Sequence, residues 1–580
     1  MNENSSIPLR SAFYHIYKRA GFLSSLMMLG VLFLIPTQGQ TQDWNPVTPK
    51  REFRAVWVAT VANIDYPRKA TIRKVPQVED FKNLLDQYKR IGFNAVIVQV
   101  RPAADAFYPS EYAPWSTYLT GNQGTPPLPL YDPLEFMIEE AHNRGLEFHA
   151  WLNPFRATMN MDTLSLAPNH VFNQHRDWLV QYGNRFYYNP GIPAVREHIS
   201  EVVAEVVRNY DVDAIHFDDY FYPYPIKNVP FPDSTIFQQS SGRFSKIENW
   251  RRHNVDLMIE QISTRIKTMK AHVKLGVSPF GVWRNKEDDD LGSDTRAGVT
   301  TFDDLYADVL KWSRNAWVDY IIPQIYWNIG FEPADYEVLL DWWSSRVHST
   351  HLYIGHAAYK VGDNPAEPWQ DPFEIPRQVE LNRSNGVCKG SAYFSSRAVL
   401  GNRLGVKDQI ANLYQTPALV PEDEEGFSKR QKQPRLRRVT YKPRLERIKI
   451  KWRPNKDDME NLPSYYVVYR FNDAVAGDFE DPTNIIHISG MNQKKKKVII
   501  YDADTEVDQT YTYVVTAMNR GHNESLPSDG RAVIRMPNRV KKVKEDRPER
   551  TRTKRPKKER RGRKNKDEID FSSDENENES

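Results

Sequence analysis

Short apolar runs alternate with amphipathic stretches between residues 54 and 394. Apolar runs of this length are typical of parallel strands that are buried on both faces. Eight runs predict strands: RAVWVATV from Arg54, FNAVIVQV from Phe93, LEFHAWL from Leu146, DAIHF from Asp213, VKLGVS from Val273, DYIIPQIY from Asp319, LYIGHA from Leu352 and VCKGSAYF from Val387.

The stretches between these runs place apolar residues at helical spacing. They predict helices over 78–91, 133–144, 195–210, 247–269, 302–313 and 376–385. Eight strand and helix units in this order predict an α/β fold, a closed (β/α)8 TIM barrel over residues 51–415. No predicted strand is followed by a glycine-rich phosphate loop, which disfavours a dinucleotide-binding sheet.

The pattern changes after residue 415. Residues 416–432 are polar and proline-rich, which indicates a linker. Residues 433–537 hold β-rich runs, namely RIKIKW, SYYVVYRF, KKVIIYDA, TYTYVVTAMN and RAVIRM, and they predict a small all-β sandwich. Residues 538–580 are poor in apolar residues and carry charge in blocks, so we expect a disordered basic and then acidic tail.

The first 40 residues resemble an export signal. Arg10, Lys18 and Arg19 precede an apolar run at 21–35, which has 15 residues, whereas a spanning helix needs about 20. We therefore expect cleavage and export to the periplasm, the cell envelope or the medium, with a retained anchor as the alternative. The single cysteine, Cys388, lies in a predicted strand and is expected to be a buried apolar side chain.

The net charge of +4 is unevenly distributed. Residues 541–566 carry 15 Lys or Arg and four acids, and residues 567–580 carry seven acids, which leaves residues 1–540 neutral. A neutral globular part argues against a nucleic-acid-binding core. We expect association with anionic envelope polymers only through the basic tail. Nothing in the sequence indicates a cofactor, a metal or an obligate protein partner.

The fourth strand carries the strongest chemical signal. It ends in IHFDDYFYPYP, which places Asp218 and Asp219 side by side where catalytic groups of such barrels lie. Neighbours on a regular strand face opposite sides, so both reach one sugar only if the strand has ended. Adjacent acids fit substrate-assisted glycoside cleavage. Our hypothesis is that Asp218 orients a 2-acetamido group, Asp219 is the general acid/base, and Tyr326 or Asn328 binds the acetamido oxygen.

Polar and aromatic residues at the ends of the other strands are candidates for binding the substrate, because sugar faces stack on rings and sugar hydroxyls bond to polar groups. These candidates are Asp65, Arg101, Asp105, His149, Trp151, Asn153, Arg156, Tyr220, Trp283, Gln324, Trp327 and Asn328.

Structural interpretations compete with these roles. The alternative role for the two adjacent aspartates is to cap a turn. Asp65 stands before Tyr-Pro, as turn residues do, and the alternative role for Asp105 is to support Arg101 through an ion pair. His149 and His216 lack metal-binding spacing, so core or substrate contacts are favoured for them.

Six long motifs in order resemble the glycosyl-hydrolase-like 10 family of exported bacterial barrel proteins. They are REFRAVWVATVANIDYP, VIVQVRPAADAFYPSEYAPWS, GLEFHAWLNPFR, IHFDDYFYPYP, LGVSPFGVWRN and YIIPQIYWN. The resemblance implies a (β/α)8 barrel with glycosidase activity on peptidoglycan strands that lack stem peptides, with the acids of IHFDDY at the site. Residues 433–537 resemble a fibronectin type III module, chiefly through TYTYVVTAMNRGHNESLPSDG and Trp452.

Three other functions stay open at this point. The first is a conventional glycosidase that uses Asp105 and Asp218 as a carboxyl pair on another polysaccharide. The second is a non-catalytic carbohydrate-binding envelope protein. The third is a metal-dependent hydrolase or deacetylase that uses His149, His216 and Asp218.

Overall fold

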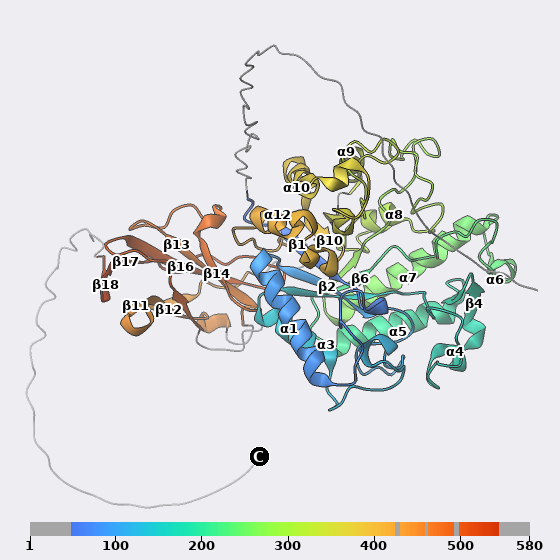
Figure 1. Ribbon diagram of the computed structural model, residues 1–580, viewed down its shortest axis with the longest axis horizontal. Helices are drawn as coiled ribbons and strands as arrows, with labels where there is room; N and C mark the ends of the chain where they lie inside the picture. Colours follow the sequence, from blue (N-terminus) through green and yellow to red (C-terminus); the bar gives the residue numbers. More distant parts are fainter. Residues whose placement is uncertain (1–47, 348, 424–429, 459–461, 492–497, 544–580) are drawn as a thin grey trace, which may run out of the picture. The chain divides into compact units, whose positions relative to one another are not determined.

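The computed structural model describes residues 48–347, 349–423, 430–458, 462–491 and 498–543 (Figure 1). All of them fall in one unit of the chain that begins at Thr48. The predicted signal segment at 1–40 lies outside the described residues, as does the predicted tail of 538–580 from residue 544 onward. The first residues of that predicted tail are not disordered but form the strand β18 (Arg539–Lys542), which pairs with β17 (Arg531–Met536). Within the described ranges, no helix has both the length and the apolar character needed to cross a bilayer.

Eight parallel strands close into a barrel in the order β1-β10-β9-β8-β7-β6-β3-β2, which confirms the predicted fold. Each predicted apolar run supplies one strand. The strands are β1 (Phe53–Val58), β2 (Ala95–Arg101), β3 (Glu147–Leu152), β6 (Ala214–Phe217), β7 (Lys274–Val277), β8 (Tyr320–Ile321), β9 (His351–His356) and β10 (Cys388–Tyr393). Cys388 is a buried free thiol at the start of β10, as its surroundings in the sequence predict.

Alternate residues of the strands fill the barrel, so its interior is a packed core. Phe53, Ala55 and Trp57 of β1 belong to this core, together with Tyr320 of β8. A Cβ atom at Gly276 of β7 would lie 1.9 Å from the ring of Tyr320. The absence of a side chain at position 276 is therefore what lets the Tyr320 ring occupy the barrel interior.

The helices lie outside the barrel strands (Figure 1). They are α1 (Lys74–Ile91), α2 (Thr117–Thr120), α3 (Pro133–Asn143), α4 (Val171–Gln174), α5 (Pro193–Asn209), α6 (Ser234–Ser240), α7 (Ile247–Met269), α8 (Val309–Arg314), α9 (Tyr336–Arg346), α10 (Glu374–Asn385), α11 (Ser396–Gly401) and α12 (Val406–Leu413).

Five of the six predicted helices match an observed helix closely, and the sixth is shorter than predicted. Residues 302–313 predict one helix, but α8 begins only at Val309. Tyr306 has a φ of 53°, a left-handed conformation that a right-handed helix cannot contain. Asp308 then caps α8 by accepting a hydrogen bond from the Lys311 N–H.

A hairpin that the sequence analysis missed follows β3. Its strands are β4 (Leu179–Tyr182) and β5 (Arg185–Tyr188), which pair in antiparallel fashion. Gly183 turns the chain with a φ of 60°. Two residues that include a glycine, between β-rich runs, are a hairpin signal that the sequence does carry.

The C-terminal domain consists of antiparallel sheets, as its β-rich runs predict. One sheet has the order β11-β12-β15 and the other β14-β13-β16-β17-β18. The strands are β11 (Arg435–Lys442), β12 (Arg447–Arg453), β13 (Tyr465–Phe471), β14 (Ile485–Ile488), β15 (Val498–Asp502), β16 (Thr510–Met518), β17 (Arg531–Met536) and β18 (Arg539–Lys542).

A buried charge cluster joins this domain to the N-terminal end of the barrel. Glu147 of β3 accepts a 2.7 Å hydrogen bond from His522, in the loop between β16 and β17, and forms a 3.3 Å ion pair with Lys274 of β7. Burial would raise the pKa of Glu147, but the charge of Lys274 and the bonds from His522 and His149 hold it well below its usual range. Glu147 is therefore a buried anion with its charge compensated.

Candidate active site

A cavity of about 460 Å³ opens at the C-terminal ends of the barrel strands, where enzymes with this fold hold their active sites. Its lining residues come from β1, β2 and β3 and from the loops that follow the barrel strands. They are Trp57, Ala59, Val61, Ile64, Gln99, Trp151, Arg156, Asp218, Asp219, Tyr220, Tyr224, Ser278, Phe280, Gln324, Tyr326, Trp327, Tyr359, Lys360 and Phe394.

Asp218 and Asp219 both line this cavity. Strand β6 ends at Phe217, so the two residues lie where strand geometry no longer forces neighbouring side chains to opposite faces. Both are buried, with 4% and 5% of their surface exposed. The sequence could not establish this arrangement, because it depends on where the strand ends.

Asp218 is fixed by two donors. Its Oδ2 accepts a 2.7 Å hydrogen bond from the side-chain amide of Asn153, and its Oδ1 accepts one of 3.2 Å from the Tyr220 N–H. Asn153 is itself held, because Gln99 Nε2 donates to its Oδ1 over 2.7 Å. Asn153 does not line the cavity, so it positions Asp218 and is not placed to bind substrate as predicted.

Asp219 has a different environment. Its Oδ2 accepts a short hydrogen bond from the hydroxyl of Tyr224, which is five residues further along the same loop. The ring of Tyr224 packs edge-on against that of Tyr220, with ring centres 5.7 Å apart. The tyrosines that follow β6 in the sequence therefore hold the second acid and form one wall of the cavity.

Burial raises the pKa of both acids, by different amounts. For Asp218 the burial is opposed by the charge of Arg156 and the bond from Asn153, and the pKa rises to about 6. For Asp219 the burial is reinforced by the negative charge of Asp218, and the pKa rises to about 7. Asp218, which the charge of Arg156 and the Asn153 amide favour as an anion, is therefore the acid that ionises first, and Asp219 is the one that keeps its proton longer. One carboxylate and one carboxylic acid at a cavity suit charge stabilisation and proton donation.

Two donors complete the polar part of the cavity. Burial raises the pKa of Tyr326 well above its usual range, so its hydroxyl stays protonated and can donate. The guanidinium of Arg156 lies 4.4 Å from the ring centre of Tyr220, and its buried Nε has no hydrogen-bond partner among the described residues. Both residues are among the predicted site residues.

Aromatic rings line the remaining walls. Trp327 packs edge-on against Phe280, and Tyr326 lies 6.4 Å from Phe394 between ring centres. The predicted residues Trp151, Tyr220, Gln324 and Trp327 all line the cavity. A largely aromatic pocket with a few convergent polar groups is suited to binding a sugar ring.

Three predicted binding residues have structural roles away from the cavity. The Asp65 carboxylate accepts hydrogen bonds from Ala59 N, Ser395 Oγ and Arg397 N, which uses its oxygens to join two loops. Arg101 donates to the backbone oxygen of Asn153 and to Tyr188. Asp105 is buried outside the cavity, and this burial raises the pKa of its carboxyl group.

Three further predicted residues also lie elsewhere. His149 is in the barrel interior, where its ring bonds to Tyr320 over 2.8 Å and to Glu147 over 3.2 Å. Trp283 stacks on Trp342, with ring centres 5.9 Å apart. Asn328 donates its amide to the backbone oxygen of Ile329 and does not line the cavity. Of the two predicted partners for an acetamido group, the structure places only Tyr326 beside the acids.

The metal-dependent alternative has no support in the geometry. His216 bonds to Tyr320 over 3.1 Å and to Ser278 over 3.0 Å, and burial holds its pKa well below the usual range. Both histidines are thus partnered beneath the cavity floor. Within the ranges that the structure describes, no three His, Cys, Asp or Glu side chains are grouped to hold a metal ion.

Sequence reasoning missed several lining residues. Lys360 ends a 3-10 helix after β9 (Ala358–Lys360), where its Nζ donates a 2.6 Å hydrogen bond to the Tyr326 backbone oxygen. Tyr359 and Phe394 were not identified either, although each follows the end of a barrel strand. Position after a strand end was the available signal, but it does not tell which of several loop residues turns inward.

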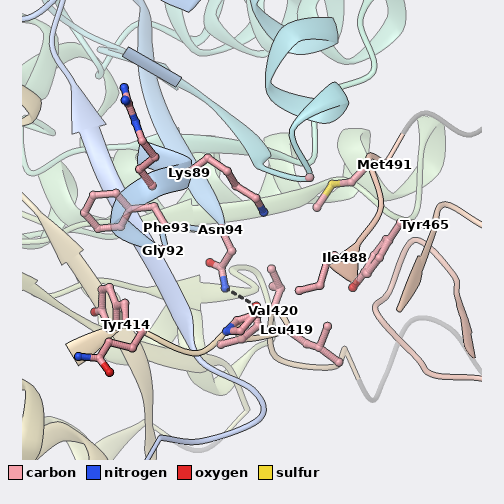
Figure 2. Close-up of a pocket in the computed structure, with 15 residues that line it drawn as sticks. Lys89, Gly92, Phe93, Asn94, Tyr414, Leu419, Val420, Tyr465, Ile488 and Met491 are labelled. Atoms are coloured by element: carbon pink, nitrogen blue, oxygen red, sulfur yellow. Dashed lines mark hydrogen bonds between the residues drawn. The ribbon is translucent and has the colours of Figure 1, made fainter. Parts of the chain in front are cut away.

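A second cavity, of about 150 Å³, lies at the opposite end of β2 and is lined by barrel residues and by residues of the C-terminal domain (Figure 2). Asn94 and Ala418 both line it, and the Asn94 Nδ2 donates a 3.2 Å hydrogen bond to the Ala418 backbone oxygen. Its lining includes Lys89 and no carboxylate. It therefore lacks the carboxyl groups that glycoside cleavage ordinarily uses.

Comparisons with known proteins agree with this geometry. The family model described as glycosyl hydrolase-like 10 matches residues 52–371. The chain is 45% identical to the glycosyl hydrolase YngK of Bacillus subtilis strain 168 over 512 residues, which are 87% of this chain and 97% of the relative. It is 41% identical to the glycosyl hydrolase DigH of Escherichia coli strain K12 over 382 residues, which are 62% of this chain and 86% of that one.

Among solved structures, the glycoside hydrolase domain of PgaB (BpsB) from Bordetella bronchiseptica matches with a TM-score of 0.42 and 12% identity, over 62% of this chain and 98% of that one. This similarity is too low to support an inference about activity. The family model and the named relatives support a glycosidase. The chain is a glycosidase and belongs to the glycosyl hydrolase-like 10 family.

Proposed function

We propose that this enzyme cleaves an N-acetylated glycan with help from the substrate's own acetamido group. The observation that carries the proposal is the pair Asp218 and Asp219, adjacent in sequence, both in one ring-lined cavity and with unequal raised pKa values. A conventional pair of Asp105 and Asp218 is not supported, because Asp105 lies outside the cavity.

The proposed reaction has two steps. The acetamido oxygen attacks the anomeric carbon while Asp219 gives its proton to the leaving oxygen, and the ionised Asp218 stabilises the positive charge that develops on the acetamido nitrogen. The hydroxyl of Tyr326 orients the acetamido group. Asp219, now ionised, then takes a proton from the water that opens the cyclic intermediate. Two displacements at one carbon give a product that retains the anomeric configuration.

The substrate class we propose is peptidoglycan strands that lack stem peptides, after export of the enzyme to the periplasm, the envelope or the medium. The family resemblance and the signal-like residues 1–40 support this part. The two antiparallel sheets after the barrel support the proposal of a fibronectin type III-like domain. The basic residues 541–566 support the proposal that the tail associates with anionic envelope polymers.

Product analysis tests the proposal. Purified enzyme is incubated with peptide-free peptidoglycan strands, and the products are identified by mass spectrometry. The same strands carrying N-trifluoroacetyl groups should be cleaved more slowly, since the fluorinated amide oxygen is a weaker nucleophile. Equal rates on both substrates would contradict participation of the acetamido group, and intact strands would contradict the substrate class.

A further inference from the structure

The hairpin of β11 and β12 concentrates positive charge in a globular part that is neutral as a whole. Residues 435–453 contain nine Lys or Arg and a single acid, Glu446. In β12 the residues alternate between the core and the outside, with Ile448, Ile450 and Trp452 buried. The cations of β12 therefore share the outer face of the sheet β11-β12-β15.

The strand register places cations directly opposite one another on this outer face. Arg435 pairs with Arg453, Arg438 with Lys451, and Lys442 with Arg447. Like charges opposite each other on neighbouring strands destabilise a sheet. None of the ion pairs found among the described residues includes Arg438, Lys442, Arg447 or Lys449. Three pairs of cations therefore face each other on the outer face, and in the Lys442–Arg447 pair neither cation belongs to any of those ion pairs.

The third strand adds an aromatic ring to the same face. Tyr501 of β15 pairs with Lys449, and Ile499 pairs with Lys451. Both β15 side chains are exposed, at 43% and 40%. The Nζ of Lys449 lies 5.7 Å from the centre of the Tyr501 ring. A row of cations about 20 Å long is therefore flanked by a ring that can pack against a sugar.

We propose that this outer face, made of Arg435, Arg438, Lys442, Arg447, Lys449, Lys451, Arg453 and Tyr501, binds an acidic polysaccharide chain. A linear polyanion that lies along the hairpin would place a negative charge beside each of these cation pairs in turn. A membrane surface fits less well, since two exposed apolar residues on one edge strand give little area to insert. Nucleic acid fits less well because the face offers one ring for stacking. The proposal is independent of the barrel cavity and of the tail.

Binding measurements on the full chain test this site. The probes are polygalacturonate, which is a linear carboxylated polysaccharide without acetamido groups, and pullulan as its neutral counterpart. We compare the wild type with R438T/K449T, in which threonine preserves strand propensity. The matched control K69T/K286T removes the same charge from two exposed lysines of the barrel.

The wild type should bind polygalacturonate in a salt-dependent way and leave pullulan unbound. R438T/K449T should bind about tenfold more weakly and with a shallower salt dependence, whereas the control should remain close to the wild type. Unchanged binding by R438T/K449T would overturn the proposal, because the basic tail would then account for the affinity. Tighter binding to a DNA duplex or to phosphatidylglycerol vesicles, lost in R438T/K449T, would overturn the choice of occupant.

A second variant separates binding from folding. Lys442→Glu converts the repulsive pair with Arg447 into an attractive one. The melting temperature should rise or hold while the affinity for polygalacturonate falls. A lower melting temperature with unchanged affinity would show that Lys442 serves the fold, and the assignment of this face to binding would fail.

Discussion

The side-chain amide of Asn153 donates a 2.7 Å hydrogen bond to Oδ2 of Asp218. Asn153 follows β3 and Asp218 follows β6, and these two strands are neighbours in the barrel. The amide fixes the direction in which the carboxylate points. It also favours the ionised form, which is the form that the proposed mechanism needs.

Asn153→Ala should lower kcat by about 10- to 100-fold, since a hydrogen bond to a charged group contributes about 1.5–3 kcal/mol. The loss of the donor should also raise the pKa of Asp218, so the acidic limb of the pH profile should move upward. Asn328→Ala is the control, because Asn328 does not line the cavity and its amide bonds to the Ile329 backbone oxygen. Equal kcat values in Asn153→Ala and the wild type would refute the positioning role.

The dependence of kcat/KM on pH should be bell-shaped, with its maximum between about 6 and about 7. Activity falls below this window because Asp218 takes up a proton, and above it because Asp219 loses one. The Tyr224 hydroxyl lowers the pKa of Asp219, so Tyr224→Phe should shift the basic limb to higher pH. A basic limb at the same pH in the wild type and in Tyr224→Phe would count against the assignment of that limb to Asp219.

Asp219→Asn should abolish turnover and stabilise the protein at high pH. The pKa of Asp219 is raised from its usual value of 3.8 to about 7 in the folded state, so the wild type loses stability as the pH rises between these two values, and the amide does not. Above about pH 7 the variant should gain roughly 2–4 kcal/mol in the free energy of unfolding. Urea denaturation at several pH values measures the gain. Equal denaturation curves for the wild type and the variant at high pH would show that burying the ionised Asp219 carboxylate does not lower the free energy of unfolding.

Gly276→Ala should destabilise the barrel strongly, because the new methyl group would overlap the ring of Tyr320. Overpacking of a core costs about 1–3 kcal/mol, and a rigid ring held by two histidines has little room to move. Gly298→Ala is a matched control, since nothing lies within 4 Å of its added Cβ. Similar melting temperatures for the two variants would mean that the ring relocates without cost.

The fold follows from the sequence to a large extent. Strands buried on both faces give apolar runs that helices interrupt, so the eight barrel strands and five of the helices could be predicted. The start of α8 could not, because the left-handed conformation of Tyr306 breaks a pattern that reads as helical. The hairpin of β4 and β5 carries a turn signal at Gly183, but a search for long apolar runs does not detect its two short strands.

The site could be predicted only in part. Position after a strand end identifies residues near the cavity, as for Asp218, Asp219 and Tyr326. It does not tell whether a side chain is used by the fold, as Asp65 is by Ser395 and Arg397. Position after a strand end also does not fix how deep a side chain lies along the barrel axis. For this reason it could not show that His149 lies below the floor of the cavity. Both properties depend on contacts between residues far apart in the chain.

The charge cluster beneath the barrel has a consequence for the chain's architecture. His522 reaches Glu147 from a loop more than a hundred residues beyond the barrel. A chain truncated after residue 415 would lack this partner and would open the base of the barrel to water beside Lys274. The β-sandwich thus covers the base of the catalytic domain. If the two domains were to be produced separately, the residues at that base would have to be redesigned.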